Sequence, residues 1–301
     1  MESGIAVVGA GAIGCYFGGM LARAGNKVTL IGRQKHIDPI ARSGLLFRSQ
    51  SRDERIAIDA TTDIAAVGSA SLILFCVKSL DTENAARTMA PHLAPDAVIL
   101  SLQNGVDNAE RIRLHVKNRV MPVLVYAAAQ MIGPGSVEHT GGGNLVIGQA
   151  AGDIAGLFTA AGVPVKVSED IDSELWTKLV MNCAYNAICA LTGTPYGKMT
   201  ANPEVRAVMI AAVEEVAAIA KAKGVRLPAD ITDAAIRLSE AMPRTMSSTA
   251  QDIAQGRPTE IDHLNGYVAR QGAALGIPAP VNRSLAALTK LLEETKSGAK
   301  T

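Results

Sequence analysis

The segment Ile5-Ala6-Val7-Val8-Gly9-Ala10-Gly11-Ala12-Ile13-Gly14 decides the fold of this chain. Its apolar first half predicts a buried strand, and its glycines have the G-x-G-x-x-G spacing of a turn that opens a helix. Gly9 allows the tight turn, Gly11 lets the backbone approach a pyrophosphate, and Gly14 allows the helix to pack closely on the strand. The N-terminus of that helix would offer unpaired N–H groups and a positive dipole end to phosphates. We therefore predict a dinucleotide-binding turn made of Gly9, Ala10, Gly11, Ala12, Ile13 and Gly14.

The residues after the second expected strand indicate which dinucleotide is bound. That strand ends Ile31-Gly32-Arg33-Gln34-Lys35, without a carboxylate that could accept hydrogen bonds from a ribose 2′-hydroxyl. Arg33 lies 19 residues after Gly14, and a guanidinium fork suits a 2′-phosphate. We therefore expect NADP(H); the alternative is a solvated surface arginine.

The first half of the chain alternates short apolar runs with helical segments. We expect strands at residues 5–8, 27–31, 72–77, 97–102 and 120–126, and helices at 13–24, 82–89 and 108–115. Several strands lack apolar–polar alternation, which is typical of parallel strands buried on both faces. Glycine-rich segments at 133–135 and 141–143 are expected to be turns that bracket a short segment and link strands closing the sheet.

From about Ser168 onward, Ala-rich segments with helical periodicity dominate. They cover residues 174–191, 204–223, 229–241, 260–275 and 283–294. The predicted fold class is therefore α/β, with an N-terminal Rossmann-like doubly wound sheet over residues 1–167 and an all-helical domain over residues 168–301.

The composition excludes several classes of protein. Of the 301 residues, 48% are hydrophobic and 19% charged, as in a globular enzyme with a substantial core. A net charge of 29 − 28 = +1 and an aromatic fraction of 3% give no basis for a nucleic-acid or membrane-surface partner.

The opening Met1-Glu2-Ser3-Gly4 has no basic leader, and no run of 18 apolar residues occurs, so we expect neither a signal peptide nor a membrane span. Four cysteines without a C-x-x-C pair are expected to be buried thiols of a cytoplasmic protein without a metal site: Cys15, Cys76, Cys183 and Cys189.

Three polar residues recur along one apolar helical segment. Lys178, Asn182 and Asn186 follow the i, i+4, i+8 spacing that places side chains on one face of a helix. A lysine and two amides among apolar neighbours need partners, and a cleft lined by ligand would provide them. Burial would also lower the pKa of the lysine, which helps it to donate a proton. The alternative is a solvated stripe on a half-exposed helix.

The chain resembles the ketopantoate reductase (2-dehydropantoate 2-reductase) family over almost its whole length. Besides the glycine turn and the polar stripe, the resemblance rests on four segments: Cys76-Val77-Lys78-Ser79, Gln103-Asn104-Gly105-Val106, Ser247-Ser248-Thr249-Ala250-Gln251-Asp252-Ile253 and Glu260-Ile261-Asp262-His263-Leu264-Asn265-Gly266. The family transfers a hydride from NADPH to C2 of ketopantoate, which yields pantoate for pantothenate and coenzyme A synthesis.

The resemblance implies a role for each matched residue. Lys178 would be the catalytic proton donor, and Asn182, Asn186 and Ser248 would bind substrate. Asn104 would contact both substrate and cofactor, while Lys78, Glu260 and, by a looser match, Ala128 would lie on the cofactor side. The resemblance also leaves room for a homodimer formed through the helical domain.

Each of these roles has a structural alternative. Asn104-Gly105 is also ordinary turn chemistry, Lys78 also ends a strand, and Ser248 could be an ordinary helix hydroxyl. Glu260 could simply favour the helix dipole in the first turn of a helix started by Thr259-x-x-Asp262.

The resemblance has one departure. Where the family often has Pro-Asn-Gly, this chain has Pro195-Tyr196-Gly197, so the substrate amide contact is lost and the exact 2-oxo acid is left open. The sequence thus predicts an NADPH-dependent 2-oxo acid reductase, with ketopantoate as the first candidate substrate. The alternatives are a related reductase or dehydrogenase for another 2-oxo or 2-hydroxy acid, and a non-catalytic NADP(H) sensor.

Overall fold

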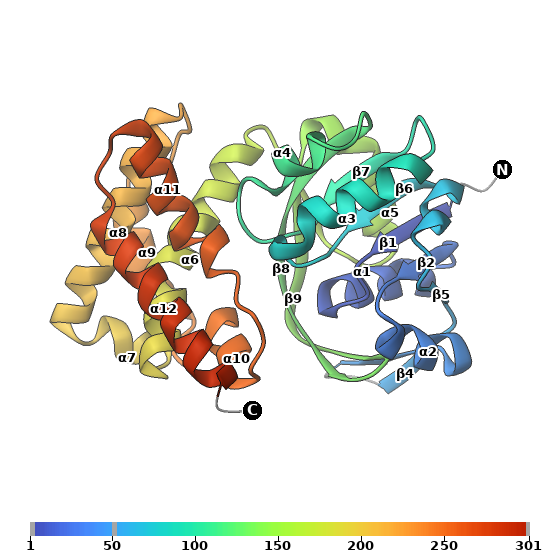
Figure 1. Cartoon of the computed structure of the whole chain (residues 1–301), viewed down its shortest axis with the longest axis horizontal. Coiled ribbons are helices and arrows are strands. Elements are labelled where there is room, and N and C mark those ends of the chain that lie inside the picture. The colour runs from blue at the N-terminus through green and yellow to red at the C-terminus, as the bar shows by residue number, and fades with distance from the viewer. Residues whose placement is uncertain (1–3, 50–52, 299–301) are drawn as a thin grey trace. The chain divides into compact units, whose positions relative to one another are not determined.

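The computed structural model describes residues 4–49 and 53–298, which form two compact units (Figure 1). The units divide between Ile171 and Asp172, a few residues after the expected boundary at 167/168. The opening residues 1–3, on which the prediction of no signal peptide partly depends, lie outside the described residues.

The N-terminal unit is built on a sheet in which strands run in the order β4-β3-β9-β8-β7-β6-β1-β2-β5, with β10 beside β9. The strands are β1 (Gly4–Val8), β2 (Val28–Ile31), β3 (Leu45–Arg48), β4 (Asp53–Ile56), β5 (Asp59–Thr61), β6 (Ala70–Phe75), β7 (Val98–Ser101), β8 (Arg119–Gly133), β9 (Ser136–Gly148) and β10 (Val165–Ser168). The six strands from β8 to β5 in this order are all parallel. Because β2 and β6 flank β1 on opposite sides, the chain changes direction between β1 and β6, as in a doubly wound sheet.

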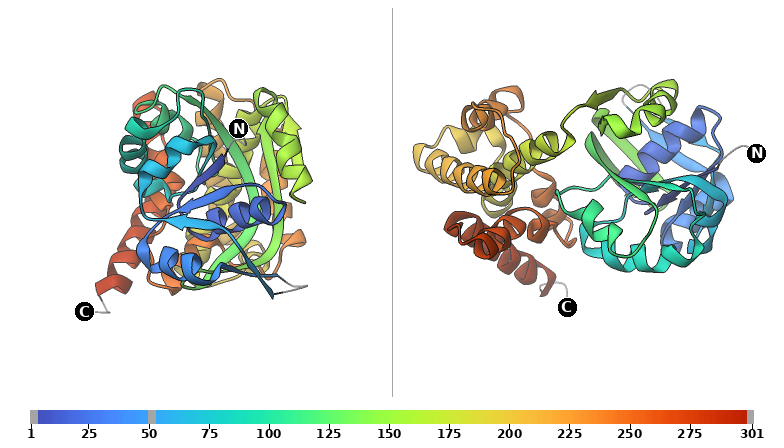
Figure 2. Two further views of the ribbon diagram at one scale, coloured as in Figure 1. Left: turned by 90° about the vertical axis from the view of Figure 1, so that its right-hand side faces the viewer. Right: turned by 90° about the horizontal axis from the view of Figure 1, so that it is seen from above.

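Both faces of β1, in the middle of the parallel strands, are buried, as predicted. In β1, Ile5 and Val7 pack on one side with α1 (Ala12–Arg23), α2 (Gln34–Ser43) and α5 (Gly152–Ala160). Ala6 and Val8 pack on the other side with η1 (Ile64–Ser69), α3 (Thr82–Met89) and α4 (Asn108–Arg113). Figure 2 shows these helices on both faces of the sheet. Alternate residues of each strand therefore enter two different cores, which explains the continuous apolar runs.

The glycine-rich segments near residue 140 differ from the prediction. Strands β8 and β9 form one long antiparallel hairpin whose turn is Pro134-Gly135, so the first glycine-rich segment is a turn as expected. Gly141–Gly143 lie inside β9, where the register shifts against Tyr126 and Ala127, and the prediction of a turn there is wrong. A Cβ at Gly143 would overlap the Tyr16 hydroxyl, so close packing on α1 is the reason for a glycine at that position.

The C-terminal unit consists of helices within the described residues. They are α6 (Ile171–Thr192, which begins at the unit boundary), α7 (Tyr196–Thr200), α8 (Pro203–Ala222), α9 (Ile231–Ala241), α10 (Ser248–Ala254), α11 (Asn265–Leu275) and α12 (Pro280–Gly298). The single helix expected over 260–275 is instead a 3-10 turn, η5 (Ile261–His263), followed by α11. The helical conformation is interrupted at Leu264. Glu260 precedes the 3-10 turn rather than lying in the first turn of an α-helix. The short helix α7 was not predicted, and a helix at α10 was considered only as the alternative for Ser248, because neither is long enough to show a helical period.

Candidate functional site

The glycine turn after β1 has the steric properties expected of a dinucleotide-binding turn. Gly9 has a φ of +111°, and a Cβ there would lie 2.7 Å from the backbone of Cys76 and Val77. A Cβ at Gly14 would overlap the Gly9 carbonyl oxygen, so the helix can approach the strand only with glycine. A Cβ at Gly11 would meet nothing within 4 Å, which leaves the backbone at the start of α1 open to a ligand. The turn therefore fits a phosphate-bearing cofactor that contacts the first N–H groups of α1.

The carboxyl ends of neighbouring strands bring the expected cofactor-side residues to one edge of the sheet. Val8 pairs with Ile31 in β2 and with Phe75 in β6, and Phe75 pairs with Ser101 in β7. Gly9, Arg33, Lys78 and Asn104 each follow one of these strand ends within a few residues. This edge contains the point between β1 and β6 where the strand order reverses, and open α/β sheets bind their ligands at such a point.

The end of β2 carries positive charge. Arg33 is exposed and occupies the N-cap position of α2. Burial lowers the pKa of His36, and the positive charges of Lys35 and Arg33 lower it further. The residues after β2 thus form a cationic region that suits an anionic group.

The loop after β7 contains Asn104, which the sequence suggested either as a turn residue or as a ligand contact. Gly105 has a φ of +95°, so Asn104-Gly105 is indeed turn chemistry. The same turn lies at the carboxyl edge of the sheet, and Asn104 is only partly buried. Ala128 lies farther along β8, exposed in the part of the hairpin that extends beyond the strand's pairing with β7.

In the C-terminal unit, helix α6 places Lys178, Asn182 and Asn186 on one face, as their spacing predicts. Lys178 and Asn182 are partly buried and Asn186 is buried. Within the described residues, neither amide side chain makes a hydrogen bond to the protein. Buried or partly buried amides with unused donors and acceptors favour a ligand on this face.

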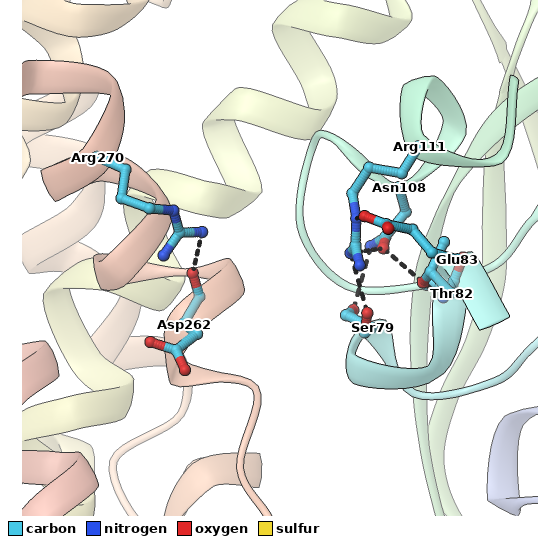
Figure 3. A network of polar contacts seen from close by, with 8 residues as sticks. Ser79, Thr82, Glu83, Asn108, Arg111, Asp262 and Arg270 are labelled. Atoms are coloured by element: carbon cyan, nitrogen blue, oxygen red, sulfur yellow. Dashed lines mark hydrogen bonds and ion pairs between the residues drawn. The ribbon is translucent and has the colours of Figure 1, made fainter. Parts of the chain in front are cut away.

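The surroundings of Lys178 change the pKa of its ammonium group. Burial lowers the pKa of its ammonium from the ordinary value of 10.5 to about 8, while the negative charge of Glu260 acts in the opposite direction. Glu260 therefore lies close enough to Lys178 to influence its charge, which the sequence could not show. The residues around Glu260 are fixed to α11 and α12, because Thr259 donates to Glu293 (Oγ1 to Oε2, 2.7 Å) and Arg270 donates to the Asp262 carbonyl (2.8 Å; Figure 3).

The two serines at the start of α10 differ: Ser247 is the N-cap, and Ser248 is the first helical residue. Ser247 is the buried N-cap: its hydroxyl accepts from the Ala250 N–H (3.1 Å) and donates to the Asn186 carbonyl (3.2 Å). Ser248, the predicted substrate residue, is exposed and is the first residue of α10. The contact of Ser247 with Asn186 brings Ser248 to the neighbourhood of the α6 face. Sequence reasoning missed Ser247, although a serine before a short helical run is a recognisable N-cap signal.

The departure at Tyr196 lies beside the same face. Tyr196 is 8% exposed in α7, and its ring packs on Tyr185 with a centroid distance of 4.3 Å. Its backbone N–H donates to the Thr245 carbonyl (3.1 Å), which connects α7 to the segment before Ser247. Tyr185 precedes Asn186 in α6, so the aromatic pair supports the end of the polar face.

Comparisons with known proteins assign the chain to a family. The family model described as ketopantoate reductase PanE/ApbA matches residues 5–152, and the model of its C-terminal part matches residues 170–293. The chain belongs to the ketopantoate reductase family. It is 32% identical to a 2-dehydropantoate 2-reductase of Pyrococcus horikoshii, with 98% of this chain and 99% of the relative covered.

Solved structures of ketopantoate reductases and of a related dehydrogenase have the same fold. A PanE/ApbA family ketopantoate reductase from Ralstonia eutropha JMP134 is 50% identical, with a TM-score of 0.93 over 97% of this chain and 99% of that one. D-mandelate dehydrogenase, solved with NADH and anilino(oxo)acetate, shares the fold with a TM-score of 0.89 at 24% identity, over 97% and 99% of the two chains.

As a member of the ketopantoate reductase family, the protein is an oxidoreductase of the 2-dehydropantoate 2-reductase type. The two matched regions contain every site residue that the sequence suggested. Among residues 4–49 and 53–298, no helix is long and apolar enough to cross a membrane. The same residues contain no group of three or more His, Cys, Asp or Glu side chains placed to hold a metal ion.

Proposed function

We propose that this protein reduces the C2 carbonyl of a 2-oxo acid with NADPH, and that ketopantoate is its substrate. The product would be pantoate, which would place the enzyme in pantothenate and coenzyme A synthesis. The observation that carries the proposal is the α6 face. It has a lysine whose pKa burial lowers to about 8, followed at one-turn intervals by two amides that make no side-chain hydrogen bond to the described part of the chain.

The residues at the carboxyl edge of the sheet fit a nicotinamide dinucleotide. The open backbone at Gly11 and the first N–H groups of α1 would hold the pyrophosphate. Arg33 would pair with the 2′-phosphate, since a guanidinium presents two parallel donors to phosphate oxygens. Lys78, Asn104, Ala128 and Glu260 are the remaining proposed cofactor contacts. When bound, the cofactor supplies the hydride.

The residues of α6 supply the proton and orient the substrate. As hydride adds to C2, the carbonyl π electrons move to oxygen, and the Lys178 ammonium donates the proton that converts this oxygen to a hydroxyl. A pKa near 8 keeps Lys178 protonated at neutral pH and still makes it a better acid than an ordinary lysine. The negative charge of Glu260 helps to retain the proton until the reaction requires it. Asn182, Asn186 and Ser248 would bind the carboxylate and hydroxyl groups of the substrate.

A second candidate is reduction of another 2-oxo acid, or oxidation of the corresponding 2-hydroxy acid. The buried ring of Tyr196, which replaces the amide of the family's Pro-Asn-Gly loop, favours this candidate because it changes the size and polarity next to Asn186. The fold is compatible with such chemistry, since D-mandelate dehydrogenase shares it.

A panel of 2-oxo acids tests the proposed reaction. The purified protein is assayed by NADPH absorbance with ketopantoate, pyruvate, 2-oxoisovalerate and benzoylformate, and then with NADH in place of NADPH. The proposal expects the highest kcat/KM with ketopantoate and NADPH. A higher kcat/KM with another 2-oxo acid would establish the second candidate, and NADPH binding without turnover of any of them would indicate a sensor.

We also propose a cytoplasmic location. The four cysteines are free thiols in the structure; three are buried as predicted, whereas Cys76 is only partly buried. Burial raises the pKa of Cys15 to about 12, so this thiol stays protonated. Buried, unpaired thiols are typical of proteins in a reducing compartment. A homodimer formed through the helical unit stays a prediction.

A further inference from the structure

A network of buried side chains joins the two loops that follow β6 and β7 in the N-terminal unit (Figure 3). Its central members Ser79, Thr82 and Asn108 are residues that are at most 3% exposed. They come from η2 (Ser79–Asp81), from the start of α3 and from the start of α4. The loops that they join carry Lys78 and Asn104, two of the proposed ligand contacts.

The backbone ladder of the sheet does not hold these loops. Pairing between β6 and β7 ends at Phe75 and Ser101, after which the Leu102 N–H still donates to the Phe75 carbonyl (3.0 Å). Beyond that point, side-chain hydrogen bonds connect the two loops. The positions of Lys78 and Asn104 therefore depend on the network rather than on strand pairing.

Asn108 fixes the backbone of Asn104 directly. Its Nδ2 donates to the Asn104 carbonyl (2.6 Å) and to the Ser79 hydroxyl (3.1 Å), and that hydroxyl donates to the same carbonyl (3.1 Å). The Oδ1 of Asn108 accepts from the Thr82 hydroxyl (2.9 Å) and from the Arg111 guanidinium (3.1 Å). Two donors on the oxygen fix the orientation of the amide, so Nδ2 can only face the Asn104 loop.

Gln103 and Arg111 complete the connection. Gln103 Nε2 donates to the Val77 carbonyl (3.0 Å) and to the Thr82 hydroxyl (2.7 Å). Arg111 donates to the Ser79 carbonyl (2.9 Å), so both neighbours of Lys78 in the chain are held by the network. A buried network whose members satisfy one another is rigid, and its members act together.

We infer that Asn108 is a positioning residue for the dinucleotide site, and that its amide sets the loops of Lys78 and Asn104 in the conformation that binds NADPH. This inference rests on the proposed use of NADPH but not on the identity of the 2-oxo acid. Asn108 acts through the Asn104 backbone and needs no contact with the cofactor.

Asn118 provides a matched control. Its Nδ2 also donates to backbone carbonyls, those of Ala94 (2.9 Å), Pro95 (3.2 Å) and Ala97 (2.9 Å). These residues precede β7, at the opposite end of the strand from Asn104. Loss of either asparagine removes side-chain hydrogen bonds to the backbone of the same unit. Of the two, Asn108 holds a loop at the carboxyl edge of the sheet, where the glycine turn lies, and Asn118 holds a loop at the opposite edge.

Direct titration of the purified protein with NADPH, followed by cofactor fluorescence, tests the inference without any 2-oxo acid. We expect the dissociation constant to rise about 10-fold in Asn108→Ala, because two hydrogen bonds to the loop are affected. In Asn118→Ala we expect it to stay within about 2-fold, with a loss of Tm similar to that of Asn108→Ala. Equal weakening in both variants, or an unchanged dissociation constant in Asn108→Ala, would overturn the inference.

A pair of nearly isosteric variants keeps the test decisive if Asn108→Ala does not fold. Thr82→Val keeps the shape of the side chain but removes the hydroxyl that orients Asn108 and accepts from Gln103. Thr82→Ser keeps that hydroxyl. We expect Thr82→Val to weaken NADPH binding severalfold and Thr82→Ser to restore it, and equal affinities in the two variants would refute the role of the network. Wild-type protein that binds NADPH but reduces no 2-oxo acid would refute the proposed reaction while leaving this inference intact.

Discussion

Replacing Lys178 by methionine should make the protein more stable and nearly inactive. Methionine is close to lysine in length but carries no charge, so Lys178→Met removes the ammonium with little change in packing. Because burial lowers the pKa of Lys178 from 10.5 to about 8, the folded protein disfavours the charged form that the unfolded chain carries without cost. At about 1.36 kcal/mol per pKa unit, this shift corresponds to an upper limit of about 3 kcal/mol of lost stability at pH 7.

The stability difference between Lys178→Met and wild type depends on pH, and its direction follows from the lowered pKa of Lys178. Below pH 8, Lys178 is charged in both states, and the folded state bears the full cost. Between pH 8 and 10.5 the unfolded chain binds more protons than the folded protein, so the free energy of unfolding of the wild type rises with pH through this window. The advantage of Lys178→Met should therefore be greatest at pH 7 and disappear by about pH 10.5.

Urea unfolding of the ligand-free proteins at pH 7 and pH 10 measures the difference in their free energies of unfolding. Steady-state kinetics measures the loss of activity. We expect kcat to fall by about 10²–10⁴-fold in Lys178→Met, and the decline of the wild-type rate above pH 8 to be absent from any residual activity. The control is Lys198→Met, which removes an exposed lysine of α7 and should change neither property. Equal stability of Lys178→Met and wild type at pH 7, together with retained kcat, would refute both the buried charge and the proton-donor role.

Three further pairs of variants test the glycine turn, the cofactor choice and the substrate choice. Gly11→Ala places its methyl in open space, so it should keep the wild-type Tm and lose NADPH affinity, whereas Gly14→Ala overlaps the Gly9 carbonyl and should lower Tm by several degrees; the reverse order in thermal melts would contradict the packing roles of the two glycines. Arg33→Ala should weaken NADPH binding by about 1–3 kcal/mol and leave NADH binding unchanged, while Arg42→Ala, at the other end of α2, should affect neither; equal losses for both cofactors would show that Arg33 does not contact the 2′-phosphate. Tyr196→Asn should shift relative kcat/KM toward ketopantoate and cost about 3 kcal/mol of stability through loss of the ring packed on Tyr185, while Tyr196→Phe should keep most of that stability; an unchanged substrate ratio in Tyr196→Asn would remove Tyr196 as a specificity determinant.

Several features of the protein could be predicted because they depend on residues close together in the chain. The positive φ of Gly9 and the close packing at Gly14 follow from a short spacing after an apolar run. The common face of Lys178, Asn182 and Asn186 follows from the 3.6-residue period of a helix. The burial of β1 on both sides follows from its unbroken apolar run.

Short or irregular elements were missed because they have no local period or spacing that a sequence pattern could show. The turn Ile261–His263 and the helix α7 contain too few residues to show a period, and the break at Leu264 has no glycine or proline to mark it. Gly141–Gly143 have the composition of a turn, but they lie in β9, where the packing of Tyr16 leaves no room for a side chain at Gly143. Glycine composition alone does not distinguish a chain reversal from a close approach.

The sequence by itself therefore determined the fold class, the glycine turn and the polar face of α6, since each is encoded by a local period or spacing. The tertiary structure alone decided that Glu260 lies near Lys178, that Ser247 rather than Ser248 is the buried cap, and that Asn108 holds the carbonyl of Asn104. The lowered pKa of Lys178 also belongs to the tertiary structure, because it arises from the removal of water by packing around the side chain. Contacts between distant segments and the burial of a charge depend on how helices and strands pack, and no pattern in a single stretch of sequence encodes them.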